Sequence, residues 1–138
     1  RWLPIFTILS GALFSAMSAT VTYCDNGYIA ELASVVIVPD DPVPGDKYQT
    51  QVSFWWPDLQ PSVSEGSQEL RITLSGFPIA NTKSPLCDNV PCPIVNGWNN
   101  HTWEGDVPTG VHGDVQIYEN WLTADGRSIF CFDVVYYI

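Results

Sequence analysis

The chain alternates between short runs rich in β-branched and aromatic residues and clusters of turn residues. The turn clusters recur at residues 39–45, 57–66, 76–93, 105–113 and 125–126. No long stretch has the 3.6-residue period of an amphipathic helix. About seven short strands at this spacing predict an all-β fold, an antiparallel sandwich of two sheets.

Alternation within each run assigns one inward and one outward face. The inward positions are expected to be Tyr48, Val52, Phe54, Trp56, Leu70, Ile72, Leu74, Val115, Ile117, Trp121, Phe130, Phe132, Val134, Tyr136 and Ile138. Trp55 falls on the outward face, and Asp125-Gly126 is a hairpin-turn dipeptide. The run ASVVIV (33–38) is apolar on both faces, so its orientation stays open.

Glu119 is the exception among the inward positions, because it is a carboxylate between apolar neighbours. Either it lies at the mouth of a cavity or a β-bulge turns it away from the core.

The N-terminal residues have the pattern of a secretory signal peptide. Arg1 precedes an apolar run from Leu3 to Phe14, and Ala16-Met17-Ser18 supplies small residues suited to cleavage. The apolar run is shorter than the roughly 20 residues of a membrane span. We therefore expect a signal peptide at 1–18 and a single domain at 19–138; the alternative is an N-terminal buried helix.

The four cysteines, an even number, are typical of a disulfide-bonded protein of an oxidising compartment. Cys87 and Cys92 close a tight loop. By elimination, Cys24 then pairs with Cys131, and these two cysteines lie near the two ends of the domain. The alternative is a zinc site built on Cys87, Cys92 and a histidine, but no second Cys or His pair lies nearby in the sequence.

Charge and composition narrow the possible partners. Of 138 residues, 46% are apolar, which is typical of a folded domain rather than a disordered one. Five basic and fifteen acidic residues give a net charge of −10, and loss of Arg1 would make it −11. Nucleic-acid binding is therefore not expected, since it requires basic groups against phosphate.

The sequence contains no recognisable catalytic pattern. There is no Gly-x-Ser-x-Gly motif, no glycine-rich phosphate loop and no Asp-x-Asp-x-Asp-Gly calcium loop. The acidic pairs and the two histidines, His101 and His112, are not arranged in a way that selects a catalytic set. We expect no enzyme activity, no cofactor and no metal. Asn100-His101-Thr102 is an N-glycosylation triplet, which predicts a surface position and a glycan on Asn100.

Four segments in register resemble the ML-domain lipid-recognition family. They are VTYCD (21–25), VIVPDDPVPGD (36–46), LCDNVPCPI (86–94) and VPTGVHGDVQIYENWLTADGRSIFCFDV (107–134). The family includes soluble cholesterol-transfer proteins of the Niemann-Pick type C kind and phosphatidylglycerol/phosphatidylinositol transfer proteins, and the second branch is the nearer likeness. The resemblance covers almost all of residues 19–138.

The resemblance implies an immunoglobulin-like β-sandwich whose sheets part to hold a sterol or phospholipid tail. It also supports the Cys24–Cys131 and Cys87–Cys92 pairs. A monomer that binds a lipid ligand and contacts membranes transiently is expected, secreted or in the lumen of an endosome, lysosome or vacuole. The side chains expected to line the lipid cavity are Val35, Ile37, Phe54, Trp56, Ile72, Leu74, Phe77, Ile79, Trp103, Val107, Val115, Ile117, Phe132, Val134 and Tyr136.

Two other functions fit the sequence. One is a lipid-sensing accessory to a receptor or hydrolase. The other is a secreted carbohydrate-binding module in which Trp55, Trp98 or Trp103 stacks on sugars. For lipid transfer, we expect faster delivery to anionic membranes near pH 5, where carboxylates and histidines, including His101 and His112, take up protons.

Overall fold

Eight strands and one short helix form the fold in the computed structural model, which describes residues 18–24 and 27–138. The expected signal peptide at 1–18 lies almost wholly outside the described residues. In chain order the elements are β1 (Thr20–Tyr23), β2 (Glu31–Val38), β3 (Lys47–Trp56), β4 (Gly66–Leu74), β5 (Phe77–Pro85), α2 (Leu86–Asn89), β6 (Gly97–Asp106), β7 (Asp114–Thr123) and β8 (Ser128–Tyr137). No helix in this part of the chain has the length and hydrophobicity needed to cross a membrane.

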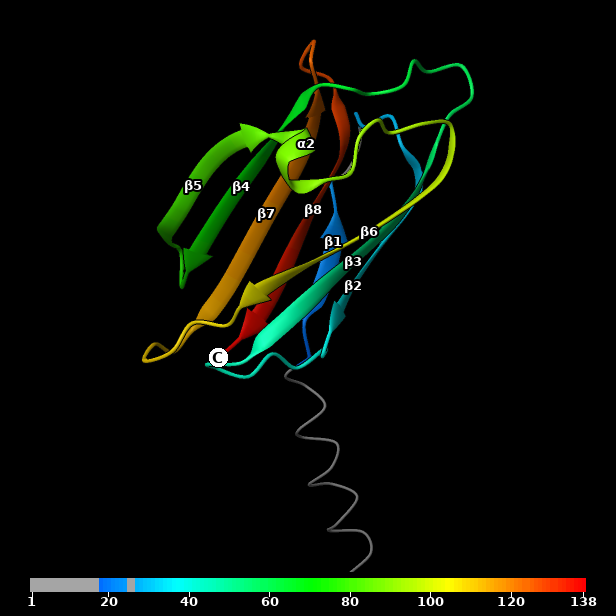
Figure 1. Cartoon of the computed structure of the whole chain (residues 1–138). Coiled ribbons are helices and arrows are strands. Elements are labelled where there is room, and N and C mark those ends of the chain that lie inside the picture. Colours follow the sequence, from blue (N-terminus) through cyan, green and yellow to red (C-terminus); the bar gives the residue numbers. More distant parts are fainter. Residues whose placement is uncertain (1–17, 25–26) are drawn as a thin grey trace, which may run out of the picture.

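The strands form two antiparallel sheets that face each other, which confirms the predicted sandwich with eight strands instead of about seven. One sheet has five strands in the order β1-β8-β7-β4-β5, and the other has three in the order β2-β3-β6 (Figure 1). The β4–β5 hairpin extends the larger sheet beyond the smaller one, so β5 and β6 are edge strands on the same side of the sandwich.

The predicted faces agree with the structure on the long strands. Along β3, Val52, Phe54 and Trp56 are buried, while Trp55 is only partly covered on the outer side. β2 buries Val35 and Ile37 and exposes the residues next to them, which settles the orientation that the sequence left open. The Asp125-Gly126 turn joins β7 to β8, and Gly126 has the positive φ of 88° that such a turn requires.

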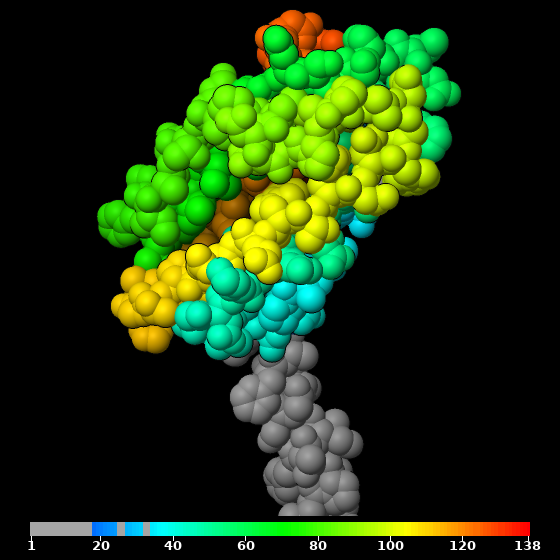
Figure 2. Space-filling view, viewed as in Figure 1, coloured from blue at the N-terminus to red at the C-terminus, as the bar shows by residue number. Residues whose placement is uncertain are grey.

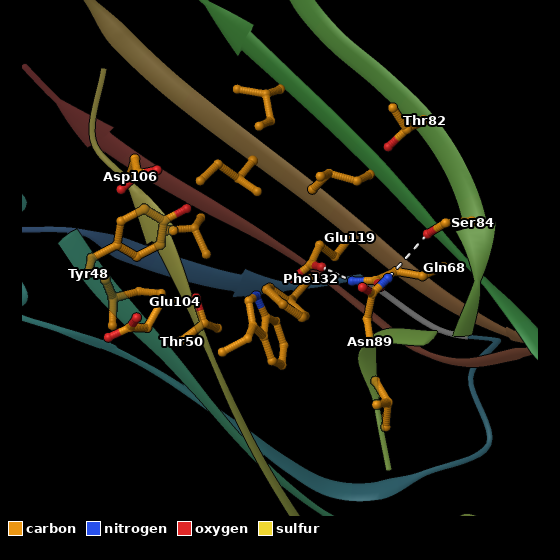
Figure 3. A pocket seen from close by; sticks show the side chains of 18 residues that line it. Tyr48, Thr50, Gln68, Thr82, Ser84, Asn89, Glu104, Asp106, Glu119 and Phe132 are labelled. Atoms are coloured by element: carbon orange, nitrogen blue, oxygen red, sulfur yellow. Dashed lines mark hydrogen bonds between the residues drawn. The ribbon is translucent and has the colours of Figure 1, made fainter. Parts of the chain in front are cut away.

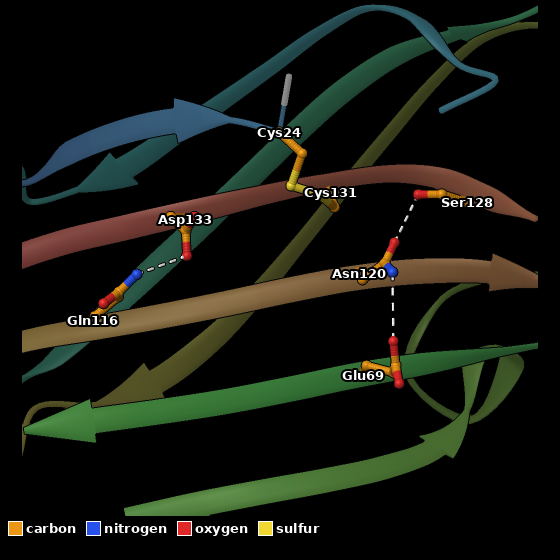
Figure 4. The surroundings of a disulfide bond; sticks show 7 residues. All are labelled: Cys24, Glu69, Gln116, Asn120, Ser128, Cys131 and Asp133. Carbon is orange, nitrogen blue, oxygen red and sulfur yellow. Dashed lines mark hydrogen bonds between the residues drawn. A yellow bond between two sulfur atoms is a disulfide. The ribbon is translucent and has the colours of Figure 1, made fainter. Parts of the chain in front are cut away.

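Both disulfides join the cysteines that the sequence paired. Cys24, directly after β1, is linked to Cys131 in β8, and the backbone N–H of Cys24 donates to the carbonyl of Cys131 at 3.2 Å (Figure 4). Cys87 in α2 is linked to Cys92, five residues later. The first link holds β1 against the larger sheet, and the second fixes α2 and the loop after it.

Candidate functional site

A cavity of about 480 Å³ lies between the two sheets, on the side of the edge strands β5 and β6. The larger sheet contributes residues from β4, β5, β7 and β8, and the smaller sheet contributes residues from β2, β3 and β6. Figure 2 shows the opening as a hollow between the green β4–β5 region and the yellow β6, with brown atoms of β7 visible inside. A hollow of this size reaches the lower end of the range of small-molecule sites.

Aromatic side chains fill the interior beside this hollow. Trp121 contacts Phe130 with ring centroids 4.9 Å apart, and Phe54 lies 5.1 Å from Phe130. Trp103 and Phe132 line the cavity on one side and pack against Trp121 and Phe130, respectively, on the other. These two rings therefore form the wall between a filled part of the sandwich and a hollow part.

The structure brings six of the fifteen expected cavity residues to the cavity: Ile37, Ile72, Trp103, Ile117, Phe132 and Val134. The others lie outside its lining. Six are packed in the core (Val35, Phe54, Trp56, Val107, Val115 and Tyr136), and Leu74 is partly buried against that core. Phe77 and Ile79 are 75% and 53% exposed at the β4–β5 hairpin, because β5 extends past the smaller sheet and no other described residue buries its tip.

Much of the cavity wall is polar, and of its polar residues only Glu119 and the inward position of Tyr48 were expected from the sequence. The polar side chains at the cavity include Tyr48, Thr50, Gln68, Thr82, Ser84 and Asn89 (Figure 3). Gln68 and Thr50 sit at inward positions of β4 and β3, so alternation could have found them if it had been applied to polar residues too. Asn89 reaches the cavity from α2, and no periodic pattern predicts that position.

Glu119 lies inside the cavity and is 3% exposed, so no bulge turns it outward. The amide of Gln68 donates a short hydrogen bond to its Oε1. Burial raises the pKa of Glu119 to about 7, and the Gln68 hydrogen bond opposes this shift. The hydrogen bonds continue outward, because Asn89 donates to Gln68 Oε1 at 3.0 Å and to Ser84 Oγ at 3.3 Å (Figure 3).

Tyr48 lies on the opposite part of the cavity from Gln68. Its ring packs against Gly105, where a Cβ would come within 2.6 Å of the ring. Burial raises the pKa of Tyr48 to about 12, so its hydroxyl stays protonated and can donate or accept a hydrogen bond.

His101 is not the freely titrating group that the sequence analysis expected. It stacks on Phe54 at 5.8 Å and meets the edge of Trp121 at 5.7 Å, and neither ring nitrogen has a hydrogen-bond partner in the structure. Burial therefore lowers the pKa of His101, which makes it a poor source of positive charge near pH 6.

The predicted glycosylation site and two of the three tryptophans proposed to stack on sugars lie on the outside of the smaller sheet. Asn100 is exposed on β6, where its Oδ1 accepts a hydrogen bond from Ser53 at 2.6 Å. Trp55 and Trp98 form a T-shaped pair at 5.6 Å on the outer face of the smaller sheet, whereas Trp103 points into the cavity. Over residues 18–24 and 27–138, no group of three or more His, Cys, Asp or Glu is close enough to hold a metal ion.

Comparisons with known proteins agree with this architecture. A family model described as the ML domain matches residues 18–138. A phosphatidylglycerol/phosphatidylinositol transfer protein of Aspergillus fumigatus is 26% identical over 122 residues, covering 82% of this chain and 68% of the relative.

Two solved structures share the fold. A Niemann-Pick type C2 protein from the Japanese carpenter ant aligns with a TM-score of 0.59 and 14% identity, over 86% of this chain and 98% of that chain. Chicken MD-1 complexed with lipid IVa aligns with a TM-score of 0.54 and 16% identity, over 86% of this chain and 88% of that chain.

Proposed function

The chain belongs to the ML-domain family, and on that basis we propose that it binds a single lipid between its two sheets and transfers it between membranes. The ligand class is a sterol or a phospholipid, with the apolar part of the molecule inside the cavity. The phospholipid alternative draws support from the name of the Aspergillus relative, a phosphatidylglycerol/phosphatidylinositol transfer protein.

The observation that carries this proposal is the hollow beside a tightly packed aromatic core. Large rings close the space next to Trp121, yet the space bounded by Ile72, Ile117 and Val134 stays open. The apolar part of the wall, to which these three side chains contribute, is removed from water when an acyl chain or a sterol ring packs against it. Each buried methylene contributes about 0.8 kcal/mol to binding.

The test is a cavity-filling substitution. Ile72→Trp places a large side chain in the hollow and should reduce binding of a fluorescent acyl-chain probe at least about tenfold, since the ring occupies the space of several methylenes. Val135→Trp on the outer face of β8 is the matched control, because Val135 is 37% exposed and lies outside the cavity. Equal binding by both folded variants contradicts the proposal, and native mass spectrometry of the purified protein identifies any lipid that it carries.

We place the membrane contact on the β4–β5 hairpin. Residues 70–87 contain Arg71 and Lys83 and no acidic residue, in a chain whose net charge is −10. The tip of this hairpin exposes Phe77 and Ile79, and β5 lies along the cavity opening. A surface that combines exposed apolar side chains with positive charge suits an anionic bilayer, and lipid leaving the bilayer here is next to the cavity.

Replacing both apolar tip residues, in the variant F77S/I79S, should weaken binding to vesicles of phosphatidylcholine and phosphatidylglycerol about tenfold, because two side chains no longer insert. Leu59→Ser is the control, since Leu59 is 96% exposed but lies in the loop between β3 and β4. Vesicle co-sedimentation measures the effect. An equal loss from the control and from the tip variant rules out the hairpin as the specific contact.

We also propose that the protein acts in a secreted or lumenal compartment, which the two disulfides support. Exposure of Asn100 and Thr102 on β6 leaves the glycosylation triplet accessible. Expression in a eukaryotic secretory host should give a protein whose mass falls on treatment with an endoglycosidase. Asn100→Gln should abolish that shift.

A further inference from the structure

Among the described residues, the charged side chains that line the cavity are all acidic. Three carboxylates line it, those of Glu104, Asp106 and Glu119, and no lysine, arginine or histidine is part of its lining. Asp106 is exposed and its charge is matched by Lys47 at 2.9 Å, and Glu104 is exposed on the same edge strand. Glu119 is therefore the one buried carboxylate among the lining residues that the structure describes.

The surroundings of Glu119 offer it hydrogen bonds but no positive charge. On β4, Gln68 donates to it and Leu70 lies opposite it in the register; on β8, Phe132 is its register partner. Across the cavity, β3 presents the neutral phenol of Tyr48, and β6 presents only the two rim carboxylates as charged groups.

On this basis we infer that the cavity binds the uncharged, hydroxyl-bearing end of a lipid next to Glu119 and Gln68, and excludes lipids whose anionic group would have to lie there. The inference rests on the proposed lipid-binding function and specifies the ligand class of the same site.

A hydroxyl group fits either protonation state of Glu119, because a hydroxyl can both donate and accept a hydrogen bond. It donates to the carboxylate, or it accepts from the carboxylic acid. A ligand carboxylate or phosphate can only accept, and next to an ionised Glu119 it meets a like charge in a poorly solvated space. An anionic phospholipid can still bind with its headgroup outside and only its tails in the cavity.

The experiment compares dodecan-1-ol with dodecanoate at pH 8, by displacement of an uncharged fluorescent probe. Any apolar cavity favours the alcohol, because an ionised ligand loses hydration on entry. The informative quantity is therefore the affinity for dodecan-1-ol divided by the affinity for dodecanoate. This ratio is compared between the wild type and each variant.

Glu119→Gln keeps the shape and one acceptor oxygen but removes the charge, and it should lower the alcohol-to-carboxylate affinity ratio at least fivefold, an expectation of about 1 kcal/mol. Glu104→Gln, the matched control on the rim, should leave the ratio within about twofold, because its charge is solvated. Glu119→Leu should lower the ratio as well, and it should also weaken dodecan-1-ol binding because it removes the hydrogen bond.

The outcomes separate two kinds of failure. If neither ligand displaces the probe from the wild type, lipid binding itself fails. If both bind but the ratio is the same in the wild type and in the folded Glu119 variants, lipid binding stands and the ligand class is wrong. Tighter binding of dodecanoate than of dodecan-1-ol by the wild type also overturns the inference.

Discussion

Glu119 shows how a single carboxylate on a strand can set the charge of a cavity whose other buried wall residues are neutral. The period of β7 points it inward between Ile117 and Trp121, and the two sheets then remove it from water. A buried carboxylate in such a place is unfavourable when ionised, so its protonation is coupled to folding.

The coupling predicts a pH-dependent contribution to stability. The pKa of Glu119 is about 7 in the fold, against 4.5 as its ordinary value, so the folded protein binds the proton more tightly than the unfolded chain. The free energy of unfolding should therefore fall as pH rises from about 4.5 through 7, by about 3 kcal/mol from this residue.

Glu119→Gln tests this prediction, because glutamine does not titrate. The free energy of unfolding of the variant minus that of the wild type should be about 3 kcal/mol larger at pH 8 than at pH 4.5, because only the wild type loses stability over this range. Urea denaturation at both pH values measures it. A difference between the two proteins that is independent of pH contradicts the raised pKa.

His101 makes the stability depend on pH in the opposite direction to Glu119. Its pKa is lowered by burial between Phe54 and Trp121, so protonation favours the unfolded chain. Its contribution to stability is present above the ordinary histidine pKa of about 6.5 and is lost as pH falls below it. The unfolding temperature of His101→Phe should therefore fall less between pH 6.5 and pH 4 than that of the wild type. Thermal unfolding at several pH values in this range measures it. An equal fall in both proteins would show that this histidine is not involved.

At the scale of elements, the two disulfides have different roles. Cys24–Cys131 spans 107 residues and attaches β1 to the larger sheet, whereas Cys87–Cys92 spans five and fixes α2. α2 in turn presents Asn89, which hydrogen-bonds to Gln68 at the cavity. The first disulfide therefore acts mainly on global stability, and the second acts on the site.

Removing each disulfide as a pair of serines should separate these roles. In the chain-entropy model the long loop contributes about 4–5 kcal/mol to stability and the short loop about 2 kcal/mol. We expect C24S/C131S to lower the free energy of unfolding more than C87S/C92S does, and C87S/C92S to weaken probe binding more. Urea denaturation and probe titration of both variants measure these effects. If C24S/C131S weakens probe binding more than C87S/C92S does, the two roles assigned to the disulfides are wrong.

At the scale of the whole molecule, charge controls the approach to membranes. Lys47 and Arg127 are paired with Asp106 and Asp125, while Arg71 lies over the ring of Tyr118 at 4.3 Å on the β4–β5 side. Lys83 lies on the same β4–β5 hairpin, and acidic side chains predominate elsewhere in a chain of net charge −10, so an anionic bilayer repels most orientations of the protein.

Acidification should relieve this repulsion and speed up transfer to anionic vesicles. Glu119, whose pKa is about 7, loses about half of one negative charge between pH 7 and pH 5, and acidic side chains in general begin to take up protons as the pH nears 5. We expect faster transfer of a labelled lipid at pH 5 than at pH 7 in low salt, a smaller difference in high salt, and a weaker dependence in Glu119→Gln. A rate that does not change with pH in low salt would show that charge does not control delivery.

The sequence by itself determined the β-sandwich, the disulfide pairs and the inward faces of β3, β7 and β8. The faces follow from local periodicity, whereas the disulfide pairs follow from the tight Cys87–Cys92 loop and the family resemblance, since four cysteines by themselves allow three pairings. It also singled out Glu119, because a carboxylate breaks an apolar pattern.

Only the tertiary structure decided where the sandwich is filled and where it is hollow. Phe54 and Ile117 share the same inward pattern, yet Phe54 meets other aromatic rings across the sheets and Ile117 faces open space. Which inward residue faces a ring and which faces a void depends on how the sheets diverge toward β5 and β6, and no local pattern encodes that divergence. For the same reason Phe77 and Ile79, which the sequence assigned to the cavity, lie exposed at the tip of the β4–β5 hairpin.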